Sequence, residues 1–334
     1  MLEKLGVGCI CGICLIIFGA CENEPIPSKM GSFLPNAKIS GVNYSQTHIL
    51  TENSLDLSPI SAQWAALIPQ YFGRQGQPII TSPFRWERLL PEAIEQARRS
   101  GLSLMIKPHV DFNESQVFRG DFTLDSEEEW QNFEARYQEI ILSLADMAES
   151  YGVEMFCVGT ELRLFVLKRP EYWRELITLV RDRYSGELVY AANWDEYHEI
   201  PFWEELDYIG VNAYFPLART PIPGEEELRL GWTWYVDALE AQANKSCKRI
   251  LFTEYGYRSA EQATWKHWEL GVGTPSDSVQ KVGYQAFFES FWEKPWVAGG
   301  LIWEWIPDPP RFNNTRWTPQ GKAAEEVIRE WYGR

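Results

Sequence analysis

The chain has 334 residues, enough for one large domain or two small ones. Its composition is 45% hydrophobic and 23% charged, which is ordinary for a globular protein. The net charge of −16 and the pI near 4.8 argue against a nucleic-acid partner, because such a surface repels phosphate backbones. The same charge favours a neutral substrate over an anionic one.

The N-terminal segment has the features of a secretion signal. The apolar run Leu5–Ala20 follows Lys4 and is shorter than the roughly 20 residues that a membrane span needs. Its end, Phe18-Gly19-Ala20-Cys21, resembles a bacterial lipobox, which predicts a signal peptide over residues 1–20 and lipidation of Cys21. Residues 21–37 then form an acidic, proline-bearing tether. We expect a lipoprotein of the cell envelope, periplasmic or surface-exposed, attached to the membrane only through this anchor. An ordinary signal peptide or a short uncleaved anchor is the alternative.

From residue 38 onward, apolar runs alternate with helical patterns. Eight apolar runs fit buried strands: 39–44, 62–69, 102–109, 153–161, 187–193, 207–214, 249–254 and 297–305. Helical spacing and capping residues predict helices at 86–100, 126–151, 170–184, 225–243, 276–292 and 318–332. At most a short helix is expected in 49–60 and 200–206, and loops are expected at 70–83 and 110–124.

This alternation predicts the fold class. Continuous apolar strands between helices indicate a parallel sheet that is covered on both faces. Eight strands over about 295 residues fit an α/β protein with a single (β/α)8 TIM barrel, which makes residues 38–334 the catalytic domain. The alternative is an open doubly wound sheet. No glycine-rich phosphate loop follows the first strand, and this disfavours the nucleotide-binding form of that alternative.

In such a barrel the carboxyl ends of the strands line the active site. Polar, aromatic and acidic residues stand at these ends: Asn43, Tyr44, Lys107, His109, Glu161, Asn193, Trp194, Asp195, Asn212, Tyr214, Glu254, Tyr257, Trp303, Glu304 and Trp305. We find no Ser–His pair, no metal triad and no lysine deep in an apolar strand that is suited to Schiff-base chemistry, so we expect neither a metal nor a cofactor. The set is typical of a site that binds sugars.

Two strand ends share one pattern, an apolar run that closes with Thr-Glu. They are Thr160-Glu161 on the fourth strand and Thr253-Glu254 on the seventh, which face each other across the barrel mouth. Two carboxyl groups can break a glycosidic bond when one donates a proton and the other is ionised. A separation of about 5–5.5 Å gives retention and a wider one inversion. Asp195, Glu196 and Glu304 are the alternative carboxyl groups near strand ends.

Several motifs together resemble one known family. They are Val158-Gly159-Thr160-Glu161-Leu162, Asn193-Trp194, Gly210-Val211-Asn212-Ala213-Tyr214, Thr253-Glu254-Tyr255-Gly256-Tyr257 and Gly300-Leu301-Ile302-Trp303. With the runs 106–111 and 318–322, the stretch Ile39 to Trp331 resembles glycoside hydrolase family 113. The resemblance implies retaining hydrolysis of β-1,4-mannosidic bonds in mannan, glucomannan or manno-oligosaccharides by double displacement.

The resemblance also implies roles for individual residues. Glu161 is then the acid/base and Glu254 the nucleophile, with Asn212 and Tyr214 beside it and Trp303 as the sugar platform. Thr160 stands where many related retaining barrels have Asn, which leaves the group that binds the sugar 2-hydroxyl open. The full set of expected substrate-binding residues is His109, Asn193, Trp194, Asn212, Tyr214, Tyr257 and Trp303.

Two other functions stay open. One is a β-glycosidase of different specificity, such as an exo-mannosidase or a β-glucan-cleaving enzyme. The other is a non-catalytic, glycan-binding surface lipoprotein, which the presence of both Glu161 and Glu254 disfavours. We expect a monomer whose partner is a β-linked polysaccharide or oligosaccharide, and endo or exo action is undecided.

Overall fold

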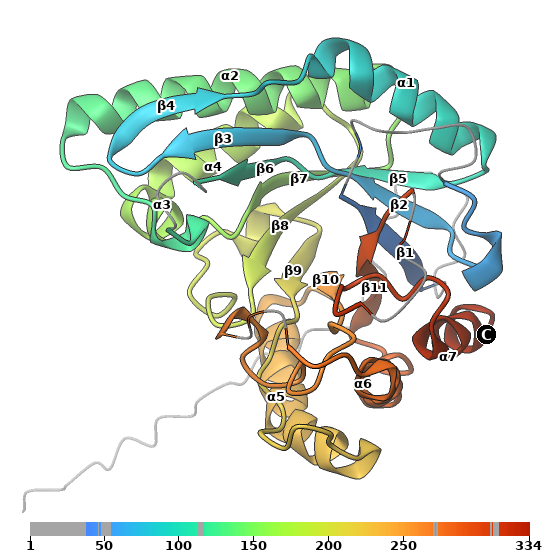
Figure 1. Cartoon of the computed structure of the whole chain (residues 1–334). Helices are drawn as coiled ribbons and strands as arrows, with labels where there is room; N and C mark the ends of the chain where they lie inside the picture. The colour runs from blue at the N-terminus through green and yellow to red at the C-terminus, as the bar shows by residue number, and fades with distance from the viewer. Residues whose placement is uncertain are drawn as a thin grey trace, which may run out of the picture. The chain divides into compact units, whose positions relative to one another are not determined.

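A closed barrel of eight parallel strands forms the centre of the computed structural model (Figure 1). The structure describes residues 38–45, 47, 55–112, 117–269, 271, 273–307, 309 and 314–334. The barrel strands are β1 (Ile39–Tyr44), β2 (Trp64–Leu67), β5 (Ser103–Ile106), β7 (Met155–Thr160), β8 (Glu187–Asn193), β9 (Tyr208–Asn212), β10 (Ile250–Tyr255) and β11 (Val297–Trp305). They pair in the order β1-β11-β10-β9-β8-β7-β5-β2. The predicted (β/α)8 barrel is confirmed, and the open sheet is wrong. The predicted signal, Cys21 and the tether lie outside the described residues.

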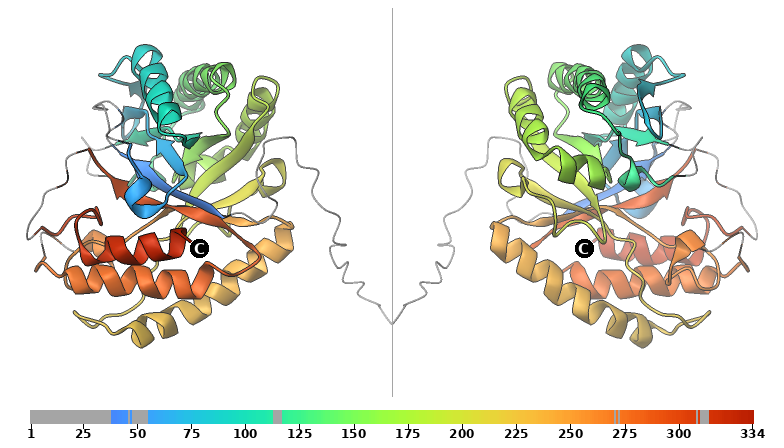
Figure 2. Two further views of the ribbon diagram at one scale, coloured as in Figure 1. Left: turned by 90° about the vertical axis from the view of Figure 1, so that its right-hand side faces the viewer. Right: turned by 90° about the vertical axis from the view of Figure 1, so that its left-hand side faces the viewer.

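In the part of the chain that the structure describes, seven α-helices connect or follow the barrel strands. They are α1 (Trp86–Arg99), α2 (Glu127–Ser150), α3 (Arg163–Lys168), α4 (Pro170–Arg181), α5 (Glu225–Ser246), α6 (Asp277–Phe291) and α7 (Ala323–Tyr332). Figure 2 shows α5, α6 and α7 side by side on one flank of the barrel, with α6 in contact with both others. The connections from β1 to β2 and from β8 to β9 contain 3-10 turns at Ser58–Ile60 and Trp203–Glu205. None of the helices in the described ranges has both the length and the hydropathy that a bilayer span requires.

Side-chain caps explain where some helices begin. The Ser126 hydroxyl accepts the Glu129 backbone N–H at 3.3 Å, and the Glu129 carboxylate accepts the Ser126 N–H at 3.0 Å. This reciprocal pair satisfies backbone donors that the first turn leaves free, so α2 begins where the sequence predicts. The predicted start of α7 at Thr318 is wrong. The Gln320 side chain instead bonds both backbone groups of Ile306, at 3.1 and 2.9 Å, and α7 begins only at Ala323.

Both segments that were expected to be loops contain strands. β3 (Gln70–Arg74) and β4 (Gln77–Thr81) form a hairpin, and β6 (His109–Asp111) pairs with β3 to complete a three-stranded sheet in the order β4-β3-β6. Gly76, at φ +68°, supplies the left-handed residue that the tight turn needs. The hairpin places Gln70 opposite His109, so this sheet holds the segment that follows β5.

The inside of the barrel is divided into an apolar and a polar layer. Apolar side chains pack into one interior cluster: Ile39, Trp64, Ala66, Met105, Met155, Cys157, Val189, Ala191, Leu251, Ala298 and Leu301. Cys157 is a buried free thiol in this cluster, where it packs as a small core residue. Toward the carboxyl ends of the strands, fully buried polar side chains replace the apolar ones: Asn43, Lys107, Asn212 and Thr253. Buried polar groups need partners, and theirs define the site.

Candidate active site

Glu161 follows the last residue of β7 and adopts a left-handed backbone conformation. Its φ is +54°, which costs a non-glycine residue on the order of 1 kcal/mol or more. The Glu161 N–H still donates to the Ala191 carbonyl of β8 at 2.8 Å. The chain therefore leaves the strand at Glu161 itself, while the residue stays 8% exposed at the barrel end.

The surroundings of Glu161 favour its protonated form. Asn212 Nδ2 donates to Glu161 Oε1 at 2.8 Å, and Arg119 Nε lies 3.8 Å from Oε2. Burial, followed by the charge of Glu254, raises the pKa of Glu161 to about 7, against opposing effects of Arg119 and Asn212. A carboxyl group with such a pKa can carry a proton near neutral pH and release it to a substrate.

Glu254, in β10, receives donors on both of its oxygens. The ammonium of Lys107 pairs with Oε1, and the hydroxyl of Tyr214 donates to Oε2 at 2.6 Å. His109 Nε2 lies 3.5 Å from the same Oε1. Both oxygens of the Glu254 carboxyl group are thus held by hydrogen-bond donors, one of them a cation.

Asn212 links the two carboxyl groups. It pairs with Glu254 in the β9–β10 register, while its side chain reaches Glu161. The Thr253 hydroxyl donates to Asn212 Oδ1 at 2.8 Å and so orients the amide, leaving Nδ2 to face Glu161. Glu161 thus has a raised pKa, whereas the carboxyl group of Glu254 is surrounded by hydrogen-bond donors. An acid and a nucleophile require this difference in surroundings.

Lys107 directly follows β5, at the strand end where the sequence places it, and is fully buried. Its ammonium also lies 3.2 Å from Asn43 Oδ1 and 3.3 Å from the Thr253 carbonyl. With these acceptors and Glu254, Lys107 is committed as a counter-ion and is not a free amine for Schiff-base chemistry.

Trp303 and His109 form one wall of the site. Their rings are nearly parallel, with an interplanar angle of 8° and centroids 5.8 Å apart. The Lys107 ammonium lies 5.7 Å from the Trp303 ring centroid. Burial, and then the charges of Arg119 and Lys107, lower the pKa of His109 well below its usual range, so this imidazole is neutral. The Trp303–Glu304 peptide bond is cis.

The chain matches the family model for glycoside hydrolase family 113 over residues 82–319. It belongs to glycoside hydrolase family 113. The protein is accordingly a glycoside hydrolase. No protein with a curated description matches the chain in sequence.

Solved structures with the same fold include two β-mannanases of family 113. A β-mannanase from Alicyclobacillus acidocaldarius is 24% identical with a TM-score of 0.78, over 89% of this chain and 97% of that one. A second family 113 β-1,4-mannanase is 23% identical with a TM-score of 0.78, over 89% and 99% of the two chains. A β-glucuronidase from Faecalibacterium prausnitzii is more distant, at 12% identity and a TM-score of 0.58 over 89% of this chain and 48% of that one.

The family 113 chain brings most of the expected residues together, with exceptions. Trp194 stacks on Trp268 at 5.8 Å and so lies on the rim of the site. Asn193 pairs with Asn212 in the sheet, but its side chain donates to Asp195 at 3.0 Å.

Tyr257 is not brought to the carboxyl pair. It is 5% exposed, and its ring covers Gly283 of α6, where an added Cβ would lie 2.6 Å from that ring. The position of Tyr257 does not support the expectation that it binds substrate. Its ring packs between β10 and α6 and is part of the core.

The other carboxyl groups near strand ends have different partners. Asp195 is exposed and pairs with Asn193. Glu196 is fully buried and accepts the Asn193 N–H at 2.8 Å, so it closes the turn after β8. Burial raises the pKa of Glu196 to about 8. Glu304 accepts the Ser45 hydroxyl at 2.5 Å, and burial raises its pKa too. None of these three carboxyl groups bonds Asn212 in the described residues, whereas Glu161 accepts its amide and Glu254 is its partner in the β9–β10 register.

Sequence reasoning missed four residues of the site: Arg119, His267, Trp268 and Trp317. An aromatic row leads from Tyr214 through His267, with centroids 4.9 Å apart, to Trp268 at a further 5.0 Å. Trp317 lies 5.3 Å from Tyr214 and 4.8 Å from His267. Arg119 and this row stand on loops, where no periodic pattern predicts which side chains face the site.

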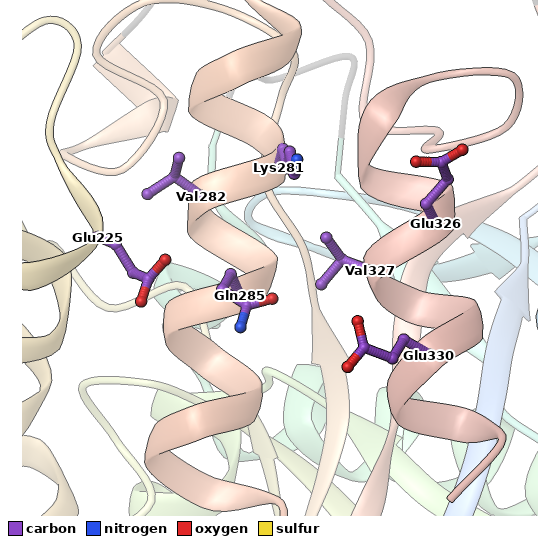
Figure 3. A pocket seen from close by; sticks show the side chains of 7 residues that line it. All are labelled: Glu225, Lys281, Val282, Gln285, Glu326, Val327 and Glu330. Carbon is purple, nitrogen blue, oxygen red and sulfur yellow. The ribbon is translucent and has the colours of Figure 1, made fainter.

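Two further features lie outside this chemistry. A groove of about 310 Å³ opens between the helices on the outer flank, lined by Glu225, Lys281, Val282, Gln285, Glu326, Val327 and Glu330 (Figure 3). It contains no strand-end residue. Within the described ranges, His, Cys, Asp and Glu side chains do not gather in threes where they could hold a metal ion.

Proposed function

We propose that this glycoside hydrolase cleaves β-1,4-mannosidic bonds with retention, by double displacement. The observation that carries the proposal is the pair Glu161 and Glu254, buried in contrasting surroundings and linked through Asn212. The solved structures that are described as family 113 β-mannanases support the choice of mannosides.

In the first step, ionised Glu254 attacks the anomeric carbon while the bond from that carbon to the leaving oxygen breaks. Glu161 gives its proton to the leaving oxygen, so the departing sugar leaves as a neutral alcohol. Lys107 and Tyr214 hold the Glu254 carboxylate in place before the attack. Trp303, beside His109, offers a flat face against which the reacting sugar can stack.

In the second step, Glu161 acts as a base. It takes a proton from water, whose oxygen attacks the anomeric carbon and releases Glu254. The covalent intermediate makes this change of role easier. Once Glu254 is an ester, it no longer carries the charge that helps to raise the pKa of Glu161. The pKa of Glu161 therefore falls when the residue must give up its proton, and its conjugate base is ready for water.

A hydrolysis assay on mannan, glucomannan, xylan and β-glucan tests the substrate. We expect reducing sugar from the two mannans, and a loss of at least about 100-fold in Glu161→Ala and Glu254→Ala. Full activity in either variant would remove that residue from the proposed mechanism. Release from xylan or β-glucan alone would leave a glycosidase of another specificity.

Proton NMR of the first product tests retention separately. A retaining enzyme releases the β-anomer first, and the α-anomer appears later by mutarotation. Initial formation of the α-anomer would mean that the two carboxyl groups act in an inverting mechanism.

A further inference from the structure

Arg119 lies beside Glu161 and has a nitrogen atom without a protein partner. Its Nη2 donates to Asp111 Oδ1 at 2.5 Å, and its Nε lies 3.8 Å from Glu161 Oε2. Its Nη1 is buried and has no hydrogen-bond partner among the described residues. A guanidinium does not lose its proton, so this N–H remains a donor, and a buried donor without an acceptor is costly. A substrate oxygen would supply the acceptor.

The hydrogen bonds of Glu161 show where that substrate oxygen comes from. Asn212 Nδ2 donates a hydrogen bond to Glu161 Oε1 at 2.8 Å. The Thr253 hydroxyl donates to Asn212 Oδ1 and so fixes the amide in this orientation. An N–H donor already faces Oε1, so the acidic proton is on Oε2. Arg119 is next to Oε2. The sugar unit that takes the proton therefore comes to lie beside Arg119.

Two elements hold Arg119 in this position. Asp111 ends β6, whose pairing with β3 ties it to the three-stranded sheet. Arg119 itself opens a 3-10 turn, Arg119–Asp121, that packs on Glu161. An added Cβ on Gly120 would lie 3.3 Å from the Glu161 carbonyl oxygen and 2.6 Å from the Phe118 ring. The side chain of Arg119 keeps 16% of its surface exposed. Arg119 is therefore held in place, and the exposed part of its side chain lies outside the buried Nη1.

We propose that Arg119 binds the departing sugar, with Nη1 donating a hydrogen bond to a hydroxyl oxygen of the unit that leaves with the cleaved bond. Asp111 is its positioning residue. The inference rests on the proposed function, because it requires a sugar as the leaving group. Asp111 already balances the charge of Arg119, so a neutral hydroxyl fits better than an anionic substituent.

Two substrates that differ only in the leaving group test whether Arg119 binds that group or acts in some other way. Both have mannose on the side that Glu254 attacks. Mannotetraose releases a sugar, whereas 4-nitrophenyl β-mannobioside releases a phenolate that has no hydroxyls to bind. In Arg119→Met we expect kcat/KM for mannotetraose to fall by about 10- to 100-fold, the usual range for a hydrogen bond to a charged group. For the aryl mannobioside we expect a change of less than about threefold, since that leaving group makes no such bond.

Further variants separate charge from hydrogen bonding. Arg119→Lys keeps the charge and loses the guanidinium fork, so the selective loss on mannotetraose should remain. In Arg119→Met the basic limb of the pH profile should move to higher pH, because Arg119 lowers the pKa of Glu161.

Asp111→Asn should give a smaller selective loss on mannotetraose, mainly through a higher KM. Arg163→Met is the matched control, because Arg163 pairs with Glu199 at 2.7 Å and should leave the ratio of the two substrates unchanged.

The activities are compared only for variants that thermal unfolding shows to be folded. Equal losses on both substrates in Arg119→Met and Arg119→Lys would assign Arg119 a structural role only and overturn the inference. Unchanged activity on both would also overturn it. If the wild type cleaves another β-glycan but no mannoside, the proposed mannanase function fails. Arg119 is then judged on the matching oligosaccharide and aryl glycoside of that glycan.

Discussion

Glu161 and Glu254 are chemically identical residues that their neighbours make different. Glu254 accepts hydrogen bonds from Lys107 and Tyr214, whereas Glu161 accepts one amide N–H and lies near Arg119. Their unequal surroundings, rather than their sequence motifs, assign the proton to Glu161.

The pKa of Glu161 sets the alkaline side of the pH profile. It is raised to about 7, and only the protonated form can act as the acid, so kcat/KM on mannotetraose should fall as pH rises through about 7. Glu161→Ala, assayed on 4-nitrophenyl β-mannobioside, should lack this limb, because nitrophenolate leaves without a proton. An unchanged limb in Glu161→Ala would assign it to another group.

Replacing Glu161 should cost activity and gain stability. Its pKa in the folded chain, about 7, lies above the ordinary value of 4.5, so the fold disfavours the ionised form. Stability therefore falls as pH rises from about 4.5 through 7, and this loss is complete above the folded pKa. At pH 8 we expect Glu161→Gln to raise the Tm by on the order of 2 °C or more.

The gain in Glu161→Gln should vanish at pH 4, where the wild-type residue is also neutral. Glu139→Gln is the control, because the Glu139 side chain is 69% exposed and pairs with Arg136 on the surface. A lower Tm for Glu161→Gln at pH 8 would contradict a raised pKa.

Lys107→Met removes one partner of a buried ion pair. The Lys107 side chain is 0% exposed and that of Glu254 6%, so the variant leaves a buried carboxylate uncompensated. We expect a loss of about 3–5 kcal/mol in the free energy of unfolding by urea. Lys266→Met should change it by less than about 1 kcal/mol, because the exposed Lys266 pairs with Glu269 on the surface. Equal effects in the two variants would mean that Lys107 is not an essential counter-ion.

At the scale of elements, the loops after the barrel strands carry the aromatic row. Tyr214 follows β9 and bonds Glu254, while His267 and Trp268 belong to the segment between β10 and α6. Trp268 is 49% exposed and stacks with Trp194. An exposed indole that continues from the reacting carboxyl groups is suited to stack on a further sugar unit. The row thus favours a cleft that accepts more than the two units around the cleaved bond.

Trp268→Ala tests this extended cleft. We expect KM for mannopentaose to rise roughly three- to tenfold, as for the loss of one aromatic contact, with kcat nearly unchanged. The aryl mannobioside should be unaffected. Trp234→Ala is the matched control, because Trp234 is 71% exposed on α5 and packs only against Tyr235 among the ring contacts of the described residues. If both variants behave alike, Trp268 is an ordinary surface residue.

At the scale of the barrel, one tyrosine ties its first and last strands together. The Tyr332 hydroxyl, at the end of α7, lies 2.9 Å from the Gly41 carbonyl, 3.1 Å from the Gly300 carbonyl and 2.7 Å from the Tyr255 hydroxyl. Beside it, Gly299 has φ +139°, and an added Cβ there would lie 2.2 Å from the Ile39 carbonyl oxygen. The seam where β1 meets β11 therefore depends on close backbone approach and on one buried hydroxyl.

Tyr332→Phe should destabilise the whole barrel. Removing the hydroxyl leaves buried acceptors short of a donor, for which we expect about 1–3 kcal/mol less free energy of unfolding. Tyr151→Phe is the control, since Tyr151 is 40% exposed after α2 and should change little. Unfolding by urea, followed by circular dichroism, compares the two. A loss of activity without a loss of stability in Tyr332→Phe would contradict a purely structural role.

The order of elements and the strand-end carboxyl groups were predictable because each rests on a local pattern. Apolar runs of strand length, helical spacing and the Ser126 cap act over a few residues, and the structure keeps all eight barrel strands. The hairpin β3–β4 was not predicted, because apolar and polar residues alternate over only a few positions in each strand. Its three-stranded sheet is complete only when β6 pairs with β3. The partner of Lys107 could not be predicted, because Glu254 is distant in the chain.

The sequence by itself determined the barrel and the two Thr-Glu strand ends, because strand and helix periods are local and parallel strands bring their carboxyl ends to one edge. Only the tertiary structure decided what surrounds those carboxyl groups. It brought Arg119 to Glu161 and Lys107 to Glu254, and it turned Tyr257 onto Gly283 in the core. The reason is physical: the direction of a loop side chain and the pKa of a carboxyl group depend on groups that only packing brings near.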